Sequence, residues 1–547
     1  TDGIRFNYAG VVPEGDGVVW RSSQAARNSI IGSYVPYLWV GAEERGLCVY
    51  GENDAGWITH PEVSCQELVR RGDSLDLVLH LIAKPGSISA PRTITMAFQA
   101  TPVKPMPKDW RRWTFGAWRA AGIPGVRHVA FMGSCWYWGT ETPCLDWYPR
   151  GQDWTYFHKL AETRRTGEVD KAFIEEWLKG FEHIYASAKT PEKRKHLEKI
   201  FRNHTNAAFH TMKGRPKTLN IYTNGRGVRF DTPEGQTFLD EWHRDAYSKR
   251  DWPPRGGAAY DLDPVASFRD YAMSHFRTMA EIMVDSFYWD DLFFQSNFDT
   301  IGTPAYVLPS GHIQPSMGLY NMREWVHRTA RMQLEMGKPV RNIIHMTNTA
   351  ITPVLAFAQM NYTWEDKGGA ADFQDRFDRD YTRAESIGLQ QGNVPFALWL
   401  VHTKDKAQAR WVERTGTGCM LVHEIKTSGG GETFWGIFRL MMEYGYGLPE
   451  VKVSQYWKKD HPAALAGSDA VSLVMSKPGS ALILVCDYGN GGDLKLTLDQ
   501  GALGLEGTLA ATDRETNSRL RVTPNGTVQF PLKKHDFKLV LVEANTP

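Results

Sequence analysis

The stretch DSFYWDDLFF, residues 285–294, decides the fold that we expect for this chain. Its aromatic run, residues 286–289, predicts a short buried strand that leads directly into two neighbouring carboxylates, Asp290 and Asp291. Adjacent acids repel each other and resist burial, so a fold rarely places them there for stability alone. At the carboxyl end of a barrel strand they would serve as an enzyme's acid, base or nucleophile. A solvated loop that begins with two acids is the simpler interpretation.

The rest of the chain predicts a three-part, multidomain architecture around this strand. Residues 1–108 contain short apolar or alternating runs set off by Gly, Asp and Pro, which favour an antiparallel β-sandwich. Residues 109–450 alternate strand-like runs with amphipathic helical stretches, which favours a central (β/α)8 barrel of the TIM type over an open sheet. Residues 451–547 return to short strands separated by Gly, Asn and Asp, and predict a second antiparallel β-sandwich.

The central segment contains seven strand-like runs. They are RHVAFMG (127–133), TLNIYTN (218–224), SFYWDD (286–291), NIIHMTN (342–348), MNYTWED (360–366), VPFALWLVH (394–402) and GCMLVHE (418–424). Between several of them lie stretches with helical periodicity, among them residues 268–283, 319–337 and 373–388. The alternation of the two patterns is what favours the barrel.

Composition limits the kinds of partner. Lys and Arg number 63 and Asp and Glu number 62, so no net field attracts a polyanion, and nucleic acid is not an expected partner. The chain contains 20 Trp, 21 Tyr and 25 Phe. This content favours a carbohydrate ligand, because the C–H faces of sugars stack on flat rings, although large aromatic cores would also account for part of it.

Other classes of function find little support in the sequence. The six cysteines have no metal-type spacing, and no glycine-rich nucleotide motif occurs, so we expect neither a metal nor a cofactor. No apolar run approaches the roughly 18 residues of a membrane span. The chain begins at Thr1 without a charged and then apolar leader, and we expect a secreted or periplasmic protein whose signal has been removed. The oligomeric state stays open.

Carboxylates and aromatic residues recur where the predicted barrel strands end. Besides Asp290 and Asp291, the candidates are Trp289, His345, Trp364, Glu365, Trp399, His423 and Glu424, with Trp136 and Trp138 just past the first strand. Glycosidic cleavage needs one carboxylic acid to protonate the leaving oxygen and one carboxylate to attack or stabilise the oxocarbenium-like carbon. We predict Asp290 as nucleophile or stabiliser and Glu365 as acid/base, with Asp291 as a competitor.

The remaining candidates would bind the sugar, and each also has a simpler interpretation. The tryptophans would stack on sugar rings or lie buried, and the two histidines would bind substrate or a neighbouring residue. Glu424 precedes a Lys and a Gly-rich loop, so it would also suit a solvated turn.

Four stretches resemble proteins related to glycoside hydrolase family 123. GLCVYGENDAGW (46–57) resembles the signature of their N-terminal β-domain, and PRTITMAFQATPVKP (91–105) resembles the exit from that domain. SFYWDD resembles the family's strand end, in which Tyr, any residue, Asp and a second acid follow one another. HMTNTAITPVLAFAQMNYTWED (345–366) resembles a later block in uncharacterised relatives. The resemblance implies the same β-domain, barrel and β-domain layout.

The resemblance also implies a chemistry. Family members of known activity are β-N-acetylgalactosaminidases that use the substrate's own 2-acetamido group as nucleophile, with an Asp that holds this group and an adjacent Glu as the acid. Asp290 would take the first role and Asp291 the second. The chain departs from the pattern at Asp291, which is one methylene shorter than Glu, so a protein-supplied pair of Asp290 and Glu365 is weighed beside substrate assistance.

The sequence therefore predicts a glycoside hydrolase that acts on an oligo- or polysaccharide without a cofactor. A substrate-assisted β-N-acetylhexosaminidase that uses Asp290 and Asp291 is one alternative. A second is a carbohydrate-binding protein without catalysis, in which the tryptophan-lined cleft only holds a glycan. A third is a polysaccharide lyase, which would use a Tyr, His or Lys base and often Ca²⁺.

Overall fold

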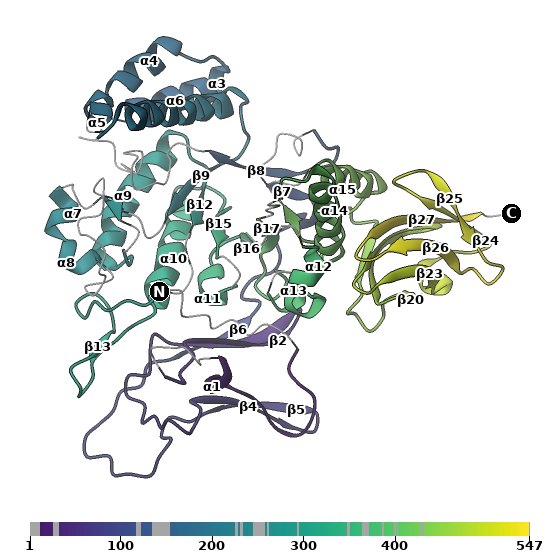
Figure 1. Cartoon of the computed structure of the whole chain (residues 1–547), viewed down its shortest axis with the longest axis horizontal. Coiled ribbons are helices and arrows are strands. Elements are labelled where there is room, and N and C mark those ends of the chain that lie inside the picture. Colours follow the sequence, from purple (N-terminus) through teal and green to yellow (C-terminus); the bar gives the residue numbers. More distant parts are fainter. Residues whose placement is uncertain are drawn as a thin grey trace. The chain divides into compact units, whose positions relative to one another are not determined.

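The computed structural model describes residues 11–25, 32–115, 122–133, 154–186, 188–224, 228–229, 233–243, 258–259, 262–290, 292, 295–346, 350–363, 371–385, 388–398, 401, 403–427 and 431–545 (Figure 1). The chain forms two compact units. Unit 1 includes Val12–Lys104 and Phe131–Met360, and unit 2 includes Pro105–Ala130 and Asn361–Pro547. The domain boundaries that the sequence suggests near 108 and 450 stay predictions.

The N-terminal part of unit 1 contains two three-stranded antiparallel sheets. One has the order β1 (Gly17–Arg21), β4 (Gln66–Arg71), β5 (Ser74–Leu79), and the other the order β2 (Tyr37–Ala42), β3 (Arg45–Tyr50), β6 (Ala97–Thr101); the short helix α1 (Ser22–Ala25) follows β1. Trp20 and Leu68 of the first sheet pack with Leu38 and Val40 of the second in one apolar cluster. A core shared by two antiparallel sheets is the arrangement of a sandwich.

One eight-stranded sheet contains the strands of the central segment. Its order is β18 (Lys426–Thr427), β17 (Val394–Ala397), β16 (Met360–Thr363), β15 (Ile343–His345), β12 (Ser286–Asp290), β9 (Leu219–Asn224), β8 (His128–Gly133), β7 (Trp113–Phe115). Every neighbouring pair with a described register is parallel. The two outermost strands, β7 and β18, contain residues whose Cα atoms lie within 8 Å of each other in unit 2. The 3-10 turn Trp110–Arg112 precedes β7.

Six of the seven predicted strand runs are confirmed as β8, β9, β12, β15, β16 and β17. The seventh prediction, GCMLVHE, is wrong. These residues end the long helix α14 (Lys406–Val422), and the strand β18 begins only after them. Cys419, Met420 and Leu421 are buried as part of a helix rather than a sheet.

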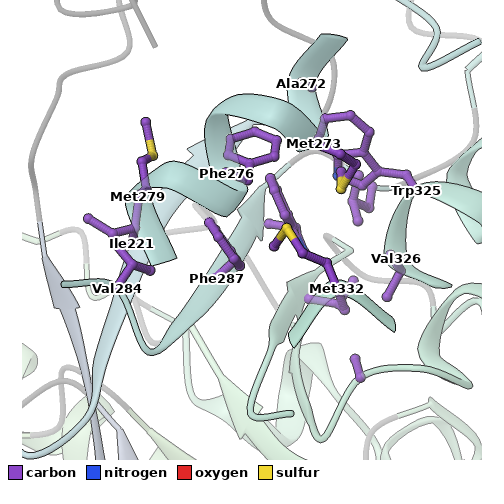
Figure 2. Close-up of a cluster of buried hydrophobic side chains, with 14 of the residues drawn as sticks. Ile221, Ala272, Met273, Phe276, Met279, Val284, Phe287, Trp325, Val326 and Met332 are labelled. Carbon is purple, nitrogen blue, oxygen red and sulfur yellow. The ribbon is translucent and has the colours of Figure 1, made fainter. Parts of the chain in front are cut away.

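Two long helices of unit 1 cover one face of β12. Helices α9 (Ala266–Ile282) and α10 (Leu319–Glu335) bury apolar residues at helical spacing. Phe276 of α9 contacts both Phe287 of β12 and Trp325 of α10, with ring-centroid distances of 5.3 Å and 5.6 Å (Figure 2). This aromatic cluster fixes the strand that carries Asp290.

Four more helices of unit 1 form a group of their own in Figure 1: α3 (Thr155–Thr166), α4 (Lys171–Lys179), α5 (Glu182–Ala186) and α6 (Pro191–Lys213). Tyr156 of α3 stacks on Trp177 of α4 at 4.6 Å between ring centroids. The remaining short elements of this unit are β10 (Val228–Arg229), α7 (Pro233–Thr237), α8 (Leu239–Trp242), β11 (Ala258–Ala259), β13 (Tyr306–Val307), β14 (Ile313–Gln314) and α11 (Thr352–Leu355).

The motif GENDAG, residues 51–56, has a structural role in unit 1. The buried carboxylate of Glu52 accepts hydrogen bonds from the backbone N–H groups of Met317, at 2.8 Å, and Tyr320, at 2.5 Å. It therefore caps the start of α10, where the backbone donors have no partner within the helix. Asn53 and Asp54 bind backbone and side-chain groups of the segment just before α10. The motif thus fastens the β-rich region to a helix that packs on β12.

Unit 2 ends in a nine-stranded antiparallel sheet. The order is β19 (Lys452–Gln455), β21 (Ala470–Lys477), β22 (Ser480–Asp487), β27 (Phe537–Asn545), β24 (Thr508–Asp513), β25 (Ser518–Val522), β26 (Val528–Lys533), β23 (Gly491–Leu498), β20 (Ala463–Ala466), with the short helix α16 (Gln500–Leu503) after β23. Strand β22 is buried on both faces: Leu482 and Leu484 pack in the cluster of the unit 2 helices, and Ile483 and Val485 pack against other strands.

The helices of unit 2 are α12 (Phe373–Arg376), α13 (Arg379–Glu385), α14 and α15 (Glu432–Tyr444). The helix predicted over 373–388 is divided in two because the Asp378 carboxylate accepts a hydrogen bond from the backbone of Tyr381, at 2.7 Å, and starts a new helical turn. Across the described part of the chain, no helix has the length and apolarity that a membrane crossing requires.

Candidate functional site

The site that the structure describes best surrounds Asp290 at the carboxyl end of β12. Strand β12 is buried along its whole length, and alternate side chains point to opposite faces of the sheet. Tyr288 and Asp290 share one face, and Phe287 and Trp289 share the other. Asp290 pairs in register with Asn224, the last residue of β9, so its carboxylate lies where the neighbouring parallel strands end.

Both carboxylate oxygens of Asp290 accept a hydrogen bond. The ring nitrogen Nδ1 of His345, on β15, lies 2.5 Å from Oδ1. An ionised carboxylate only accepts, so this nitrogen carries the proton when Asp290 is ionised. The hydroxyl of Tyr222, on β9, donates to Oδ2. Strands β9 and β15 flank β12 on either side, and the two donors therefore hold the carboxylate from both neighbours.

The site is enclosed by aromatic rings. Tyr222 stacks on Tyr288 at 5.0 Å between ring centroids, and Tyr288 lies 6.1 Å from the His345 ring. Asp290 is 5% exposed and His345 is 3% exposed. The Tyr222 and His345 donors stabilise this buried carboxyl group through hydrogen bonds. The arrangement is suited to presenting a fixed, charged oxygen to a bound molecule.

Tyr222 is a residue of this candidate site that the sequence did not identify. It is the fourth residue of β9, opposite Tyr288 in the parallel register, and its hydroxyl reaches along the sheet to Asp290. The strand TLNIYTN was predicted correctly, but Tyr222 was not among the predicted site residues. Knowledge of the register between β9 and β12 would have identified the tyrosine.

Trp289 lies on the opposite face of β12 from Asp290. It is fully buried and stacks on Phe287, with Phe276 and Trp325 at ring-centroid distances of 5.1 Å and 5.0 Å. These neighbours belong to the helix-covered face of the sheet. Trp289 is therefore a core residue, and we leave it out of the proposed sugar site.

The sequence predicted that His423 and Glu424 end a strand, and this prediction is wrong. Both residues follow helix α14 and precede β18. His423 donates from Nδ1 to the carbonyl of Cys419, at 2.7 Å, and its Nε2 lies 2.8 Å from the hydroxyl of Tyr456. Burial lowers the pKa of His423 to about 4, so it stays neutral near pH 7. Both ring nitrogens are engaged within unit 2.

Glu424 is the centre of a buried ion pair in unit 2. The guanidinium of Arg111 approaches it at 2.5 Å and 3.0 Å, and Tyr446 and Gln455 donate to it at 2.8 Å and 2.6 Å. Burial raises the pKa of the Glu424 carboxyl, but Arg111 and the other donors outweigh burial and lower it overall. A carboxylate with this many donors is held ionised, and it ties the segment before β7 to the segment before β18.

Six predicted site residues lie outside the described residues. They are Asp291, Glu365, Trp364, Trp399, Trp136 and Trp138. The acid/base role of Glu365, the competing role of Asp291 and the sugar contacts of the four tryptophans stay predictions.

Within the described part of the chain, one group of side chains could hold a metal ion: Asp372, Asp375 and His535, all in unit 2. Nδ1 of His535 lies 3.0 Å from Asp372, and the Lys534 amine lies 3.9 Å from Asp375. Both acids therefore already face a nitrogen partner within the protein. Asp290 is not a member of this group.

Comparison with known proteins gives distant structural similarity only. No protein-family model matches the sequence, and no curated protein matches it. Solved structures similar to this chain include a maltogenic α-amylase from Thermotoga neapolitana (9% identity, 63% of this chain and 82% of that chain, TM-score 0.38). A β-L-arabinopyranosidase from Geobacillus stearothermophilus has 12% identity over 62% of this chain and 76% of that chain, with a TM-score of 0.37.

A third similar structure is a putative α-N-acetylgalactosaminidase from Bacillus halodurans, with 15% identity over 66% of this chain and 81% of that chain and a TM-score of 0.36. All three structures are glycoside hydrolases by their descriptions. Similarity at this distance carries no argument about the activity of this chain.

Proposed function

We propose that this chain is a glycoside hydrolase in which Asp290 attacks or stabilises the anomeric carbon of a bound sugar. The observation that carries the proposal is the buried Asp290 carboxylate at the carboxyl end of β12, held by Tyr222 and His345 from the two adjacent strands. Parallel α/β sheets bind their ligands at this end of the strands. Stabilising a developing positive charge at carbon requires a fixed carboxylate of this kind.

We also propose that the eight strands close into a (β/α)8 barrel. The parallel registers and the approach of β7 to β18 support closure. In a barrel, Glu365 would follow β16, two strands from β12 on the same edge of the sheet. It would protonate the leaving oxygen in the first step. Water would then release the sugar, with Glu365 as the base, if Asp290 forms a covalent intermediate.

Two alternatives belong to the same site. Asp290 and Asp291 would serve a substrate-assisted β-N-acetylhexosaminidase, in which Asp290 holds the acetamido group. A protein that binds carbohydrate without cleaving it would use the same aromatic surroundings. We further propose a secreted or periplasmic location.

The test compares variants on a panel of 2,4-dinitrophenyl glycosides. Asp290→Asn should lower kcat/KM by roughly a thousandfold or more, because it removes the charge from the central carboxylate. Asp270→Asn is the matched control, since Asp270 lies on α9 and pairs with Arg328 at the surface. It should retain wild-type activity. Unchanged cleavage in both Asp290→Asn and Glu365→Gln would exclude the paired-carboxylate mechanism.

Rescue by azide distinguishes the two proposed roles of Asp290, nucleophile and stabiliser. If Asp290 is the nucleophile, Asp290→Ala with azide should regain activity and release a glycosyl azide, because a small anion occupies the space of the lost carboxylate. No rescue, together with a strict requirement for a 2-acetamido substrate and loss of activity in Asp291→Asn, would favour substrate assistance. Glycan binding without turnover on any substrate would favour the binding protein.

A further inference from the structure

A cavity in unit 1 is lined by three arginines and no carboxylate. Its volume is about 320 Å³, and its lining consists of Arg164, Arg165, Arg215, Ala161, Pro216, Ile282 and Met283. Pro216 precedes β9 and Met283 precedes β12, so the cavity lies at the amino ends of these parallel strands. Asp290 lies at the carboxyl end of β12, about 16 Å away along a five-residue strand. The cavity is therefore separate from the proposed active site.

Arg164 forms the fixed wall of this cavity. Its guanidinium donates to the carbonyl of Pro216, at 2.9 Å, and to the carbonyl of Met283, at 2.6 Å, and it pairs with Asp285 at 2.5 Å. Asp285 neutralises this one arginine and also accepts a hydrogen bond from the backbone of Leu219, at 2.8 Å. The strand ends and the cavity wall are thus held together by one ion pair.

The second arginine of the lining, Arg215, lies at an unusual backbone position. Arg215 has a left-handed backbone with φ of 53°, which a side-chain-bearing residue rarely adopts, and its guanidinium donates to the carbonyl of Thr166. Gly167, with φ of 80°, faces this guanidinium, and a Cβ at Gly167 would lie 2.9 Å from two of its nitrogens. Two unusual backbone positions therefore make room for one guanidinium.

Two positive charges are available to a ligand after Asp285 has neutralised Arg164. Arg165 and Arg215 are both exposed, and the rest of the lining is apolar. Guanidinium groups bind planar and tetrahedral oxoanions through paired N–H donors. We propose that this cavity binds the oxoanion of a small organic acid or ester: a carboxylate, a phosphate or a sulfate attached to a compact apolar or sugar-like body.

The test measures binding of sodium phosphate, sodium sulfate and sodium glucuronate to the full chain by isothermal titration calorimetry, at one ionic strength kept constant with sodium chloride. The three salts distinguish the sources of the oxoanion, and glucose is the neutral comparison. Arg165→Gln removes the charge of an exposed side chain, and Arg215→Asn removes the other while suiting the left-handed backbone. Each should weaken binding of the preferred anion by about tenfold or more.

Arg202→Gln is the matched control, because Arg202 is an exposed arginine of α6 that pairs with Glu175 outside the cavity. It should bind the anion as the wild type does. Equal binding by wild type, Arg165→Gln and Arg215→Asn would overturn the proposal, and so would the absence of any anion binding above the chloride background. In either case Arg164 and Arg215 would serve only to bind the backbone carbonyls of Pro216, Met283 and Thr166.

Discussion

Replacing Lys426 by Met should stabilise unit 2, and more so near neutral pH than in alkali. Lys426 lies on β18 and is 2% exposed, with its amine 5.0 Å from the ring centroid of Trp110 and 5.6 Å from that of Phe396. Burial lowers the pKa of this amine from 10.5 to about 7; nearby Glu424 raises it and Arg111 lowers it further, but neither outweighs burial. Protonation of the amine therefore opposes folding.

The sign and size of the effect follow from proton linkage. The folded pKa lies below the unfolded one, so the unfolded chain binds more protons between about pH 7 and 10.5, and stability rises with pH across that window. A pKa shift of this size costs about 5 kcal/mol of folding free energy once the pH is well below 7. Near pH 7 the cost is about 4 kcal/mol of folding free energy, and at pH 9.5 it is about 1 kcal/mol. Lys426→Met removes this cost at both pH values.

Urea unfolding followed by tryptophan fluorescence measures the difference. The stability gain of Lys426→Met over wild type should be about 2–3 kcal/mol larger at pH 7 than at pH 9.5. Lys452→Met is the control for replacing a lysine by methionine in the same unit, because Lys452 lies exposed on β19. A gain for Lys426→Met that does not change with pH would refute the reasoning, and so would a loss of stability at pH 7.

Two further predictions concern unit 1. Tyr222→Phe should lower kcat of the proposed glycosidase by roughly ten- to a hundredfold and change KM little. The reason is that the Tyr222 hydroxyl holds the Asp290 carboxylate rather than the substrate. An unchanged kcat on the aryl glycosides would contradict this prediction. Glu52→Ala should lower the free energy of unfolding by about 1–2 kcal/mol, because it removes the hydrogen-bond acceptor at the start of α10. The control is Glu335→Ala, which changes an exposed glutamate. Equal thermal midpoints for the two variants would contradict the capping role.

The strands were predictable from the sequence wherever an apolar run was short and bounded by turn residues. The exception, residues 418–424, shows why an apolar run alone does not distinguish a strand from a helix. Five apolar or small residues there continue a helix that begins at Lys406, and Asp405 caps its start by accepting from two backbone N–H groups. A buried helix end and a buried strand have the same local composition, so the cap thirteen residues earlier carries the information.

The site was predictable in part. The alternation of side chains along a strand explains which of its residues were predicted correctly and which were not. Asp290 and His345 were identified because each ends a predicted strand. Trp289 was assigned to the same site, although a residue adjacent to Asp290 in an extended strand must point to the other face. Tyr222 was missed because its role depends on the register of β9 against β12, and register is set by packing over the whole sheet rather than by the strand's own residues.

The two ends of β12 hold their acids, Asp285 and Asp290, in different ways. Both are acids at the boundary of one buried strand, but their partners differ. Asp285 pairs with Arg164, a cation that does not release its proton, so the charge of Asp285 is committed to holding the strand ends together. Asp290 is held by an imidazole and a phenol, which are groups that exchange protons and share charge with a bound molecule. Under the proposed function, the same strand carries a structural acid at one end and the reacting acid at the other.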